Sequence, residues 1–128
     1  MNIIKTKVTR IDTKDEISII KSTFQNNIFS AMVLDLPEDV KAGCEIQLIF
    51  KENEVMLASC ESKVSARNAF IGNIIDIEIG EILCIVSILF YDIVINSIIT
   101  KEACEYLGLE ISKDILWCVK SNEVSIRM

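Results

Sequence analysis

The sequence predicts an all-β protein made of two small barrels of similar design, with one short helix. Apolar residues make up 51% of the 128 residues but aromatic residues only 6%, so Ile, Val and Leu must build the core. The apolar runs are short and rich in β-branched residues, as strands are. The motif Lys-x-Asn-Glu-Val occurs twice, at 51–55 and at 120–124, each time after such a run.

The repeat extends through most of the chain. Residues 44–51 align with 113–120 at an offset of 69, and residues 2–11 align with 68–77 at an offset of 66. A repeat of this length suits two tandem barrels better than a solenoid. Because very small domains bury too little surface alone, the predicted domains 1–60 and 63–128 should depend on each other.

Each half is expected to contain a strand, a hairpin, a helix or turn, and two further strands. We predict hairpin turns at Asn26-Asn27 and near Tyr91-Asp92. The three extra residues of the second half fall within 100–110, where Thr100 can cap a short helix and Gly108 can end it. The uncharged run 82–91 has about half the length of a membrane helix, so it predicts a strand buried on both faces and no membrane insertion.

The composition argues against several classes of function. The formal charge of −6 disfavours nucleic acid binding. Five cysteines lie outside any C-x-x-C pair and histidine is absent, so no usual zinc ligand set is present, and we expect buried thiols in a reducing cytoplasm. The first ten residues do not read as a secretory signal. Since no nucleophile–base pair is apparent, we do not expect an enzyme.

Three stretches of the second half carry a family resemblance: "SARNAFIG" at 65–72, "IITKEACEYLGL" at 98–109 and "VKSNEVSI" at 119–126. Together they resemble the molybdate-binding Mop, or TOBE, domain family over residues 63–128. Residues 1–60 resemble a second, more divergent copy, so the chain resembles a tandem di-Mop protein. The resemblance implies OB-like barrels that exchange strands and bind oxyanions at interfaces between domains.

A tetrahedral dianion offers only acceptors, so its site must present donors and a cation. The start of the predicted helix would offer free N–H groups, and Lys120 a compact charge. The resemblance implies ligand roles for Ser65, Arg67, Thr100, Lys120 and Ser121, and no protein atom as a direct ligand of the metal. The candidate oxyanion-binding residues are therefore Ser65, Ala66, Arg67, Asn68, Thr100, Lys120 and Ser121, with Lys51 as a further candidate.

Some positions depart from the family pattern. Ala103 stands where relatives often have serine, which removes one hydroxyl donor. In the first half, Asp35, Glu38 and Glu52 add negative charge near the corresponding positions, although Lys51 is retained. We therefore expect the first domain to be mainly structural, or to lend Lys51 to a shared site.

The expected function is non-catalytic binding of molybdate or tungstate in the cytoplasm, for storage, buffering or homeostasis. The alternatives are a molybdate-responsive sensor that acts through a protein partner, and a structural oligomerisation module whose ligand site has decayed. Residues 115–119 are apolar on both faces of a predicted strand. A half of this size cannot cover both faces, so we expect a homo-oligomer, either a dimer or a trimer.

Overall fold

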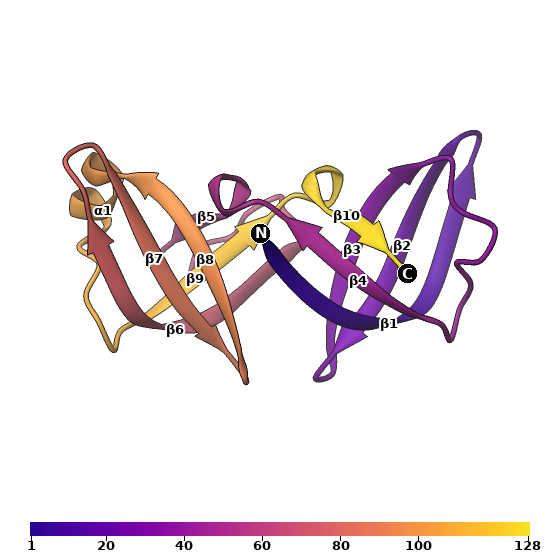
Figure 1. Cartoon of the computed structure of the whole chain (residues 1–128), viewed down its shortest axis with the longest axis horizontal. Helices are drawn as coiled ribbons and strands as arrows, with labels where there is room; N and C mark the ends of the chain where they lie inside the picture. Colours follow the sequence, from indigo (N-terminus) through magenta and orange to yellow (C-terminus); the bar gives the residue numbers. More distant parts are fainter.

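The computed structural model describes residues 1–128, which form ten strands in two five-stranded sheets, one α-helix and two 3-10 helices (Figure 1). The first half contains β1 (Asn2–Lys14), β2 (Ile17–Phe24), β3 (Asn27–Leu34), β4 (Glu45–Phe50), η1 (Glu52–Glu54) and β5 (Met56–Ala58). The second half contains β6 (Asn68–Ile79), β7 (Leu83–Phe90), β8 (Ile93–Thr100), α1 (Lys101–Leu107), β9 (Asp114–Val119), η2 (Ser121–Glu123) and β10 (Ser125–Arg127). The predicted all-β class with one short helix is confirmed.

The two sheets have the same strand order and exchange one strand each. The first sheet runs β10-β4-β1-β2-β3 and the second runs β5-β9-β6-β7-β8. The last strand of the chain, β10, pairs antiparallel with β4, where Ser125 lies opposite Ile49. In the same way β5 leaves the first half and pairs with β9, where Met56 lies opposite Cys118. The predicted exchange of strands is confirmed, and both exchanged strands lie at the junction between the sheets (Figure 1).

The sequence repeat is matched by irregularities of strand pairing at aligned positions of the two halves. The β1–β2 pairing shifts register between Val8 and Arg10, and the β6–β7 pairing shifts between Ile74 and Asp76, which are the aligned positions. The second hairpin turns at Tyr91, with φ of 55°, as predicted. The first turns at Gln25-Asn26, one residue earlier than predicted, because Asn27 already pairs with Phe24 as the first residue of β3.

The prediction that residues 82–91 are buried on both faces is wrong. Along β7, burial alternates: Cys84, Val86 and Ile88 point into the core, whereas Leu83 is 52% exposed and Leu89 is 39% exposed. Alternation of this kind is typical of a sheet with one face in the core and one toward solvent. The outer face of β7 is apolar, and no element of the chain covers it.

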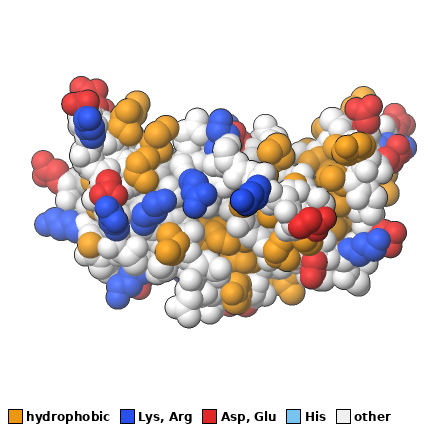
Figure 2. Space-filling view, turned by 180° about the vertical axis from the view of Figure 1, so that it is seen from behind, with side chains coloured by type: hydrophobic (Ala, Val, Ile, Leu, Met, Phe, Trp, Pro, Cys, Tyr) orange, Lys and Arg blue, Asp and Glu red, His pale blue; other side chains and the backbone are white.

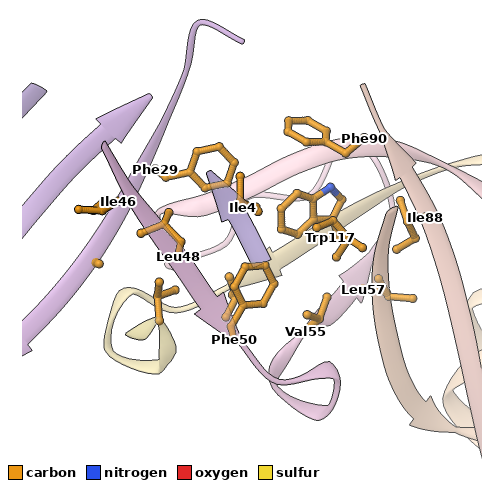
Figure 3. Close-up of a cluster of buried hydrophobic side chains, with 14 of the residues drawn as sticks. Ile4, Phe29, Ile46, Leu48, Phe50, Val55, Leu57, Ile88, Phe90 and Trp117 are labelled. Atoms are coloured by element: carbon orange, nitrogen blue, oxygen red, sulfur yellow. The ribbon is translucent and has the colours of Figure 1, made fainter. Parts of the chain in front are cut away.

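One hydrophobic core runs through both halves (Figure 3). At its centre the rings of Phe50 from β4 and Trp117 from β9 stack with centroids 6.1 Å apart and an angle of 12° between their planes. The opposite face of β9 carries Leu116 and Cys118, and Ala66 covers them. Both faces of β9 are therefore buried as predicted, but a segment of the same chain provides the cover.

The short helix forms where it was predicted. The Thr100 hydroxyl oxygen accepts a hydrogen bond from the Ala103 N–H at 3.0 Å, and Gly108 ends the helix in the left-handed conformation, with φ of 61°. Cys104 is the buried residue of α1.

The prediction of buried thiols is confirmed for three of the five cysteines, Cys84, Cys104 and Cys118. It is wrong for Cys60, which is exposed in the turn after β5, and incomplete for the half-buried Cys44 before β4.

Candidate functional site

Three of the predicted site residues, Ala66, Thr100 and Lys120, line one hollow of about 550 Å³, hereafter the Thr100 hollow. Its walls come from η1, β5, β8, α1 and η2, from the start of β7, from the end of β9 and from the segment before β6. The complete lining is Asn53, Glu54, Val55, Met56, Ala66, Leu83, Ile98, Ile99, Thr100, Ala103, Cys118, Val119, Lys120 and Glu123. The fold therefore brings together candidate site residues that lie up to 54 positions apart in the sequence, from Ala66 to Lys120.

Most of this lining is apolar, so its few polar groups decide what the hollow can hold. The side chain of Lys120 is exposed and forms no ion pair, which leaves its ammonium group free. The Thr100 oxygen already accepts from Ala103, but its O–H hydrogen remains available as a donor. An ammonium and a hydroxyl beside apolar walls can bind an oxyanion and hold it in place.

The start of α1 offers fewer free donors than the sequence suggested. The Lys101 N–H donates to the Ile82 carbonyl at 2.7 Å, and the Ala103 N–H donates to Thr100. Two of the first N–H groups of the helix are thus already used. Because α1 has only seven residues, its dipole is also a small contribution.

Two carboxylates line the Thr100 hollow and oppose an anion there. These are Glu54 from η1 and Glu123 from η2, the glutamates of the two Asn-Glu-Val motifs. The Cys118 thiol adds no negative charge, because burial, helped by the nearby Glu123, raises its pKa above the ordinary thiol value. Sequence reasoning missed both glutamates, although the repeat itself was the signal for them.

Arg67 does not line the Thr100 hollow. It lies in a second hollow of about 380 Å³, lined by Thr9, Arg10, Lys21, Ile28 and Arg67. Ser65 is exposed and lines neither of these hollows. Ala66, which lies between them in the chain, is the residue of this segment that lines the Thr100 hollow.

Asn68 and Ser121 are engaged within the protein. The Asn68 amide donates to the carbonyls of Ser30 at 2.8 Å and Val119 at 3.1 Å, and its Oδ1 accepts from the Ser30 N–H at 2.7 Å. Ser121 Oγ donates to Ser30 Oγ at 2.9 Å. The side chain of Asn68 thus has no N–H left for a ligand, and together the two residues fasten β3 to the second half.

A matching pair of hydrogen bonds joins Asn2 of β1 to Asn96 of β8. Asn2 Oδ1 accepts from the Asn96 N–H at 2.8 Å, and Asn2 Nδ2 donates to the Asn96 carbonyl at 2.9 Å. Asn2 and Asn68 are aligned positions of the repeat, and so are Ser30 and Asn96. Sequence reasoning missed Ser30 and Asn96, although the paired asparagines at the starts of β1 and β6 pointed to a shared structural role.

Lys51, the further candidate, is exposed at the start of η1 and does not line the Thr100 hollow. The Glu52 carboxylate beside it pairs with the N-terminal ammonium at 2.8 Å, and this hydrogen bond lowers the Glu52 pKa. The negative charge that the sequence placed in the first half is therefore largely compensated at this position.

Comparison with solved structures gives a likeness that covers nearly the whole chain. No protein-family model and no curated protein matches the sequence. A solved structure superposes with a TM-score of 0.89 at 25% identity, covering 98% of this chain and 94% of the other. That protein is ModG, a cytoplasmic molybdate-binding protein crystallised with molybdate bound. This chain shares the fold of ModG.

The likeness to ModG confirms the predicted fold of small OB-like barrels. ModG is described as a binding protein, not as an enzyme. In the present structure, no group of three or more Cys, Asp or Glu side chains is arranged to hold a metal ion. No helix is long and apolar enough to cross a membrane.

Proposed function

We propose that this chain is a non-catalytic binding protein for a tetrahedral oxyanion of the molybdate class, either molybdate or tungstate. The observation that carries the proposal is that Thr100 and Lys120 lie on the wall of one hollow, in a fold shared with ModG. Both residues belong to the sequence pattern that resembles Mop domains.

In this proposal Lys120 supplies the positive charge and Thr100 a hydroxyl donor. Charge-assisted hydrogen bonds are the stronger kind, so Lys120 is expected to contribute most of the binding free energy. Ser65 and Arg67 lie outside the Thr100 hollow and have no direct contact with the anion in this proposal. Asn68 and Ser121 act indirectly, by holding the two halves in register.

The two halves have different parts in the proposal. Residues 63–128 form the Mop-like unit that carries the ligand residues, and residues 1–60 form a divergent copy with a mainly structural part. The protein acts in the cytoplasm to store or buffer the anion.

We further propose that the chain assembles into a homo-oligomer, a dimer or a trimer. Large apolar side chains on the outer faces of both sheets support this, for example Leu34 at 68% and Leu89 at 39% exposure. The sequence suggested assembly because a half of this size cannot cover both apolar faces of β9. Both faces of β9 are buried within the chain, so the argument for assembly rests on the exposed outer faces of the sheets instead.

A second candidate function is a structural oligomerisation module without an oxyanion ligand. The carboxylates of Glu54 and Glu123 in the Thr100 hollow favour it, because they repel a dianion. Ala103 favours it too, since it leaves the hollow without the hydroxyl donor that relatives often have there.

Titration calorimetry with molybdate, tungstate and sulfate tests the proposal. We expect heat of binding with molybdate or tungstate, and an affinity about tenfold or more weaker in Lys120→Ala, as for loss of a charge-assisted hydrogen bond. Lys113→Ala is the matched control, because Lys113 is an exposed lysine that pairs with Glu110 outside the hollow. No heat with any of the three anions would leave the structural module as the function.

A further inference from the structure

The second hollow of the molecule, hereafter the basic hollow, is surrounded by positive charge. Its lining is Thr9, Arg10, Lys21, Ile28 and Arg67, so it contains three cations and no carboxylate. The chain as a whole has 13 Lys and Arg against 19 Asp and Glu, with a formal charge of −6. Figure 2 shows Lys and Arg side chains in a row across the half that contains β1 to β4. Cations are thus concentrated here in a protein that is acidic overall.

A β-bulge places the first two cations side by side. Arg10 of β1 lies directly opposite Lys21 of β2, just after the register shift between Val8 and Arg10. Thr9 is the extra residue of this bulge, and its hydroxyl donates to the Lys21 carbonyl at 3.2 Å. Bulges re-aim the side chains around them and are frequent beside functional sites.

Arg67 reaches the same hollow from the other half of the chain. It lies in the segment before β6, and two hydrogen bonds between Asn68 and the Ser30 backbone hold that segment against β3. In the sheet, Ser30 of β3 lies opposite Lys21 of β2. This contact therefore places Arg67 beside the pair formed by Arg10 and Lys21.

Most donors of the three cations are free to bind a ligand. Arg10 uses its Nε to pair with Asp12 at 3.0 Å, which leaves the two terminal nitrogens of its guanidinium without a partner. Lys21 and Arg67 form no ion pair. Three cations less the one carboxylate of Asp12 leave a surplus of two positive charges, which matches the charge of a dianion.

Other carboxylates of the first half lie away from the basic hollow. Asp15 is five residues from Arg10, or about 16 Å along an extended strand, which exceeds a Debye length of about 8 Å at physiological salt. Asp12 and Asp15 line a different hollow. Glu45 of β4 lies opposite Lys7 and lines another hollow with it.

The repeat shows that the fold does not need these cations. In the second half, β6 and β7 pair around the same bulge, but Asp76 and Ser87 occupy the positions aligned with Arg10 and Lys21. The pairing is therefore kept with one carboxylate and no cation at these positions. The cations of the first half must serve a purpose other than sheet formation.

We propose that the basic hollow binds a phosphate dianion, either free or as the terminal group of a small organic monoester. Guanidinium groups can bind phosphate oxygens in a bidentate way, and an ammonium adds a compact charge. Ile28, which is 59% exposed, offers an apolar contact for the organic group of a monoester. A volume of about 380 Å³ lies within the range of small-molecule sites.

This site is separate from the one in the proposed function. The basic hollow and the Thr100 hollow share no lining residue. In the Thr100 hollow one ammonium, that of Lys120, stands with the carboxylates of Glu54 and Glu123, whereas the basic hollow has a surplus of positive charge. A phosphate dianion should therefore prefer the basic hollow.

Titration calorimetry with phenyl phosphate, inorganic phosphate and phenyl sulfate tests the inference. At about pH 8 a phosphate monoester carries two charges, whereas phenyl sulfate has a similar shape and carries one. We expect phenyl phosphate to bind more tightly than phenyl sulfate, and about tenfold or more weakly in Arg10→Ser/Lys21→Ser than in wild type. Arg67→Ser, which changes a different segment, should also weaken binding by several-fold.

Lys101→Ser/Lys113→Ser is the matched control, because it removes the same charge from exposed positions of the second half outside both hollows. It should bind phenyl phosphate as wild type does. Lys120→Ala should do so too, so that failure of this site and failure of the Thr100 hollow give different results. Thermal melting and the emission of the single tryptophan, Trp117, verify that each variant is folded.

Tighter binding of phenyl phosphate than of inorganic phosphate would identify a monoester as the ligand, and equal binding would identify the phosphate group alone. No heat from wild type at millimolar phenyl phosphate would overturn the inference. Equal affinities for phenyl phosphate and phenyl sulfate would overturn it as well. So would an affinity in folded Arg10→Ser/Lys21→Ser equal to that of the control, since the basic hollow would then not be the site.

Discussion

Asn68 and Ser30 exchange a pair of hydrogen bonds across the two halves of the chain: Oδ1 of Asn68 accepts from the Ser30 N–H at 2.7 Å, and Nδ2 donates to the Ser30 carbonyl at 2.8 Å. Asn68 is fully buried, and a third bond runs to the Val119 carbonyl. The pairing satisfies backbone groups of β3 that would otherwise be buried without partners.

Asn68→Ala should therefore destabilise the protein markedly. It removes three hydrogen bonds and leaves buried groups of Ser30 unpaired, so we expect a loss of about 2–4 kcal/mol in the free energy of unfolding. Urea unfolding followed by Trp117 emission measures it. Asn122→Ala is the control, because Asn122 is exposed in η2. Equal stability of the two variants would contradict the fastening role given to Asn68.

Gly72→Ala should also be destabilising, for a steric reason. A Cβ on Gly72 would lie 2.4 Å from Cγ2 of Ile88 and 2.9 Å from the Leu89 carbonyl oxygen, closer than such atoms approach. We expect a cost of about 1–3 kcal/mol, as for other overpacked sites. Gly108→Ala is the comparison, since a Cβ there meets nothing within 4 Å and only its positive φ of 61° opposes the change. A Gly72→Ala variant as stable as wild type would show that β6 and β7 separate easily at this point.

Glu123→Gln should strengthen oxyanion binding, if the Thr100 hollow is the site. Glu123 lines that hollow, and removing its charge removes repulsion of the dianion. For a partly exposed charge pair the gain is about 0.5–1 kcal/mol, or roughly twofold to fivefold in affinity, and it should shrink as salt is added. Calorimetric titration with molybdate at two salt concentrations measures both effects. Glu38→Gln, in the exposed loop after β3, should leave the affinity unchanged, and a gain in that variant as large as in Glu123→Gln would point to net charge instead of the hollow.

The thiols should differ in reactivity and in their effect on alkaline stability. Burial raises the pKa of Cys104, where the neighbouring Cys84 adds to the shift, and burial also raises the pKa of Cys118. In the folded protein these thiols stay protonated where an unfolded thiol, with a pKa of about 8.5, begins to ionise. The stability they contribute is therefore complete below that pH and is lost as the pH rises through the raised folded pKa.

Thermal melting between neutral and alkaline pH checks the sign of this effect. The fall in melting temperature at alkaline pH should be smaller in Cys118→Ala than in wild type, and unchanged in Cys60→Ala, since Cys60 is exposed. In labelling with a thiol reagent at neutral pH, Cys60 should react first. Fast labelling of Cys118 in the folded protein would contradict the burial of its thiol.

Much of this fold could be predicted because the same pattern of strands occurs in both halves of the sequence. Apolar periodicity, the turn at Tyr91 and the capped helix from Thr100 to Gly108 were all readable locally. The exposure of the outer face of β7 could not be predicted. An apolar residue on a strand gives the same sequence pattern whether it is buried within the chain or exposed on the surface.

The candidate site could be predicted only in part, because tertiary contacts place some of its residues. The order of the motif residues predicted that Thr100 and Lys120 belong together, and they share a hollow. The segment before β6 is oriented by tertiary contacts, chiefly those of Asn68 with Ser30, and these carry Arg67 to a different hollow. No local pattern around Arg67 encodes that placement.

Because β5 and β10 are exchanged, each half of the sequence contributes one strand to the sheet of the other half. A protease cut between Ser59 and Lys63 would give two fragments, one ending just after β5 and the other still carrying β10. Each fragment would then hold an edge strand hydrogen-bonded into the other's sheet, and both would share the aromatic stack of Phe50 on Trp117. The nicked protein should behave as two interlocked fragments that separate only when both sheets unfold together.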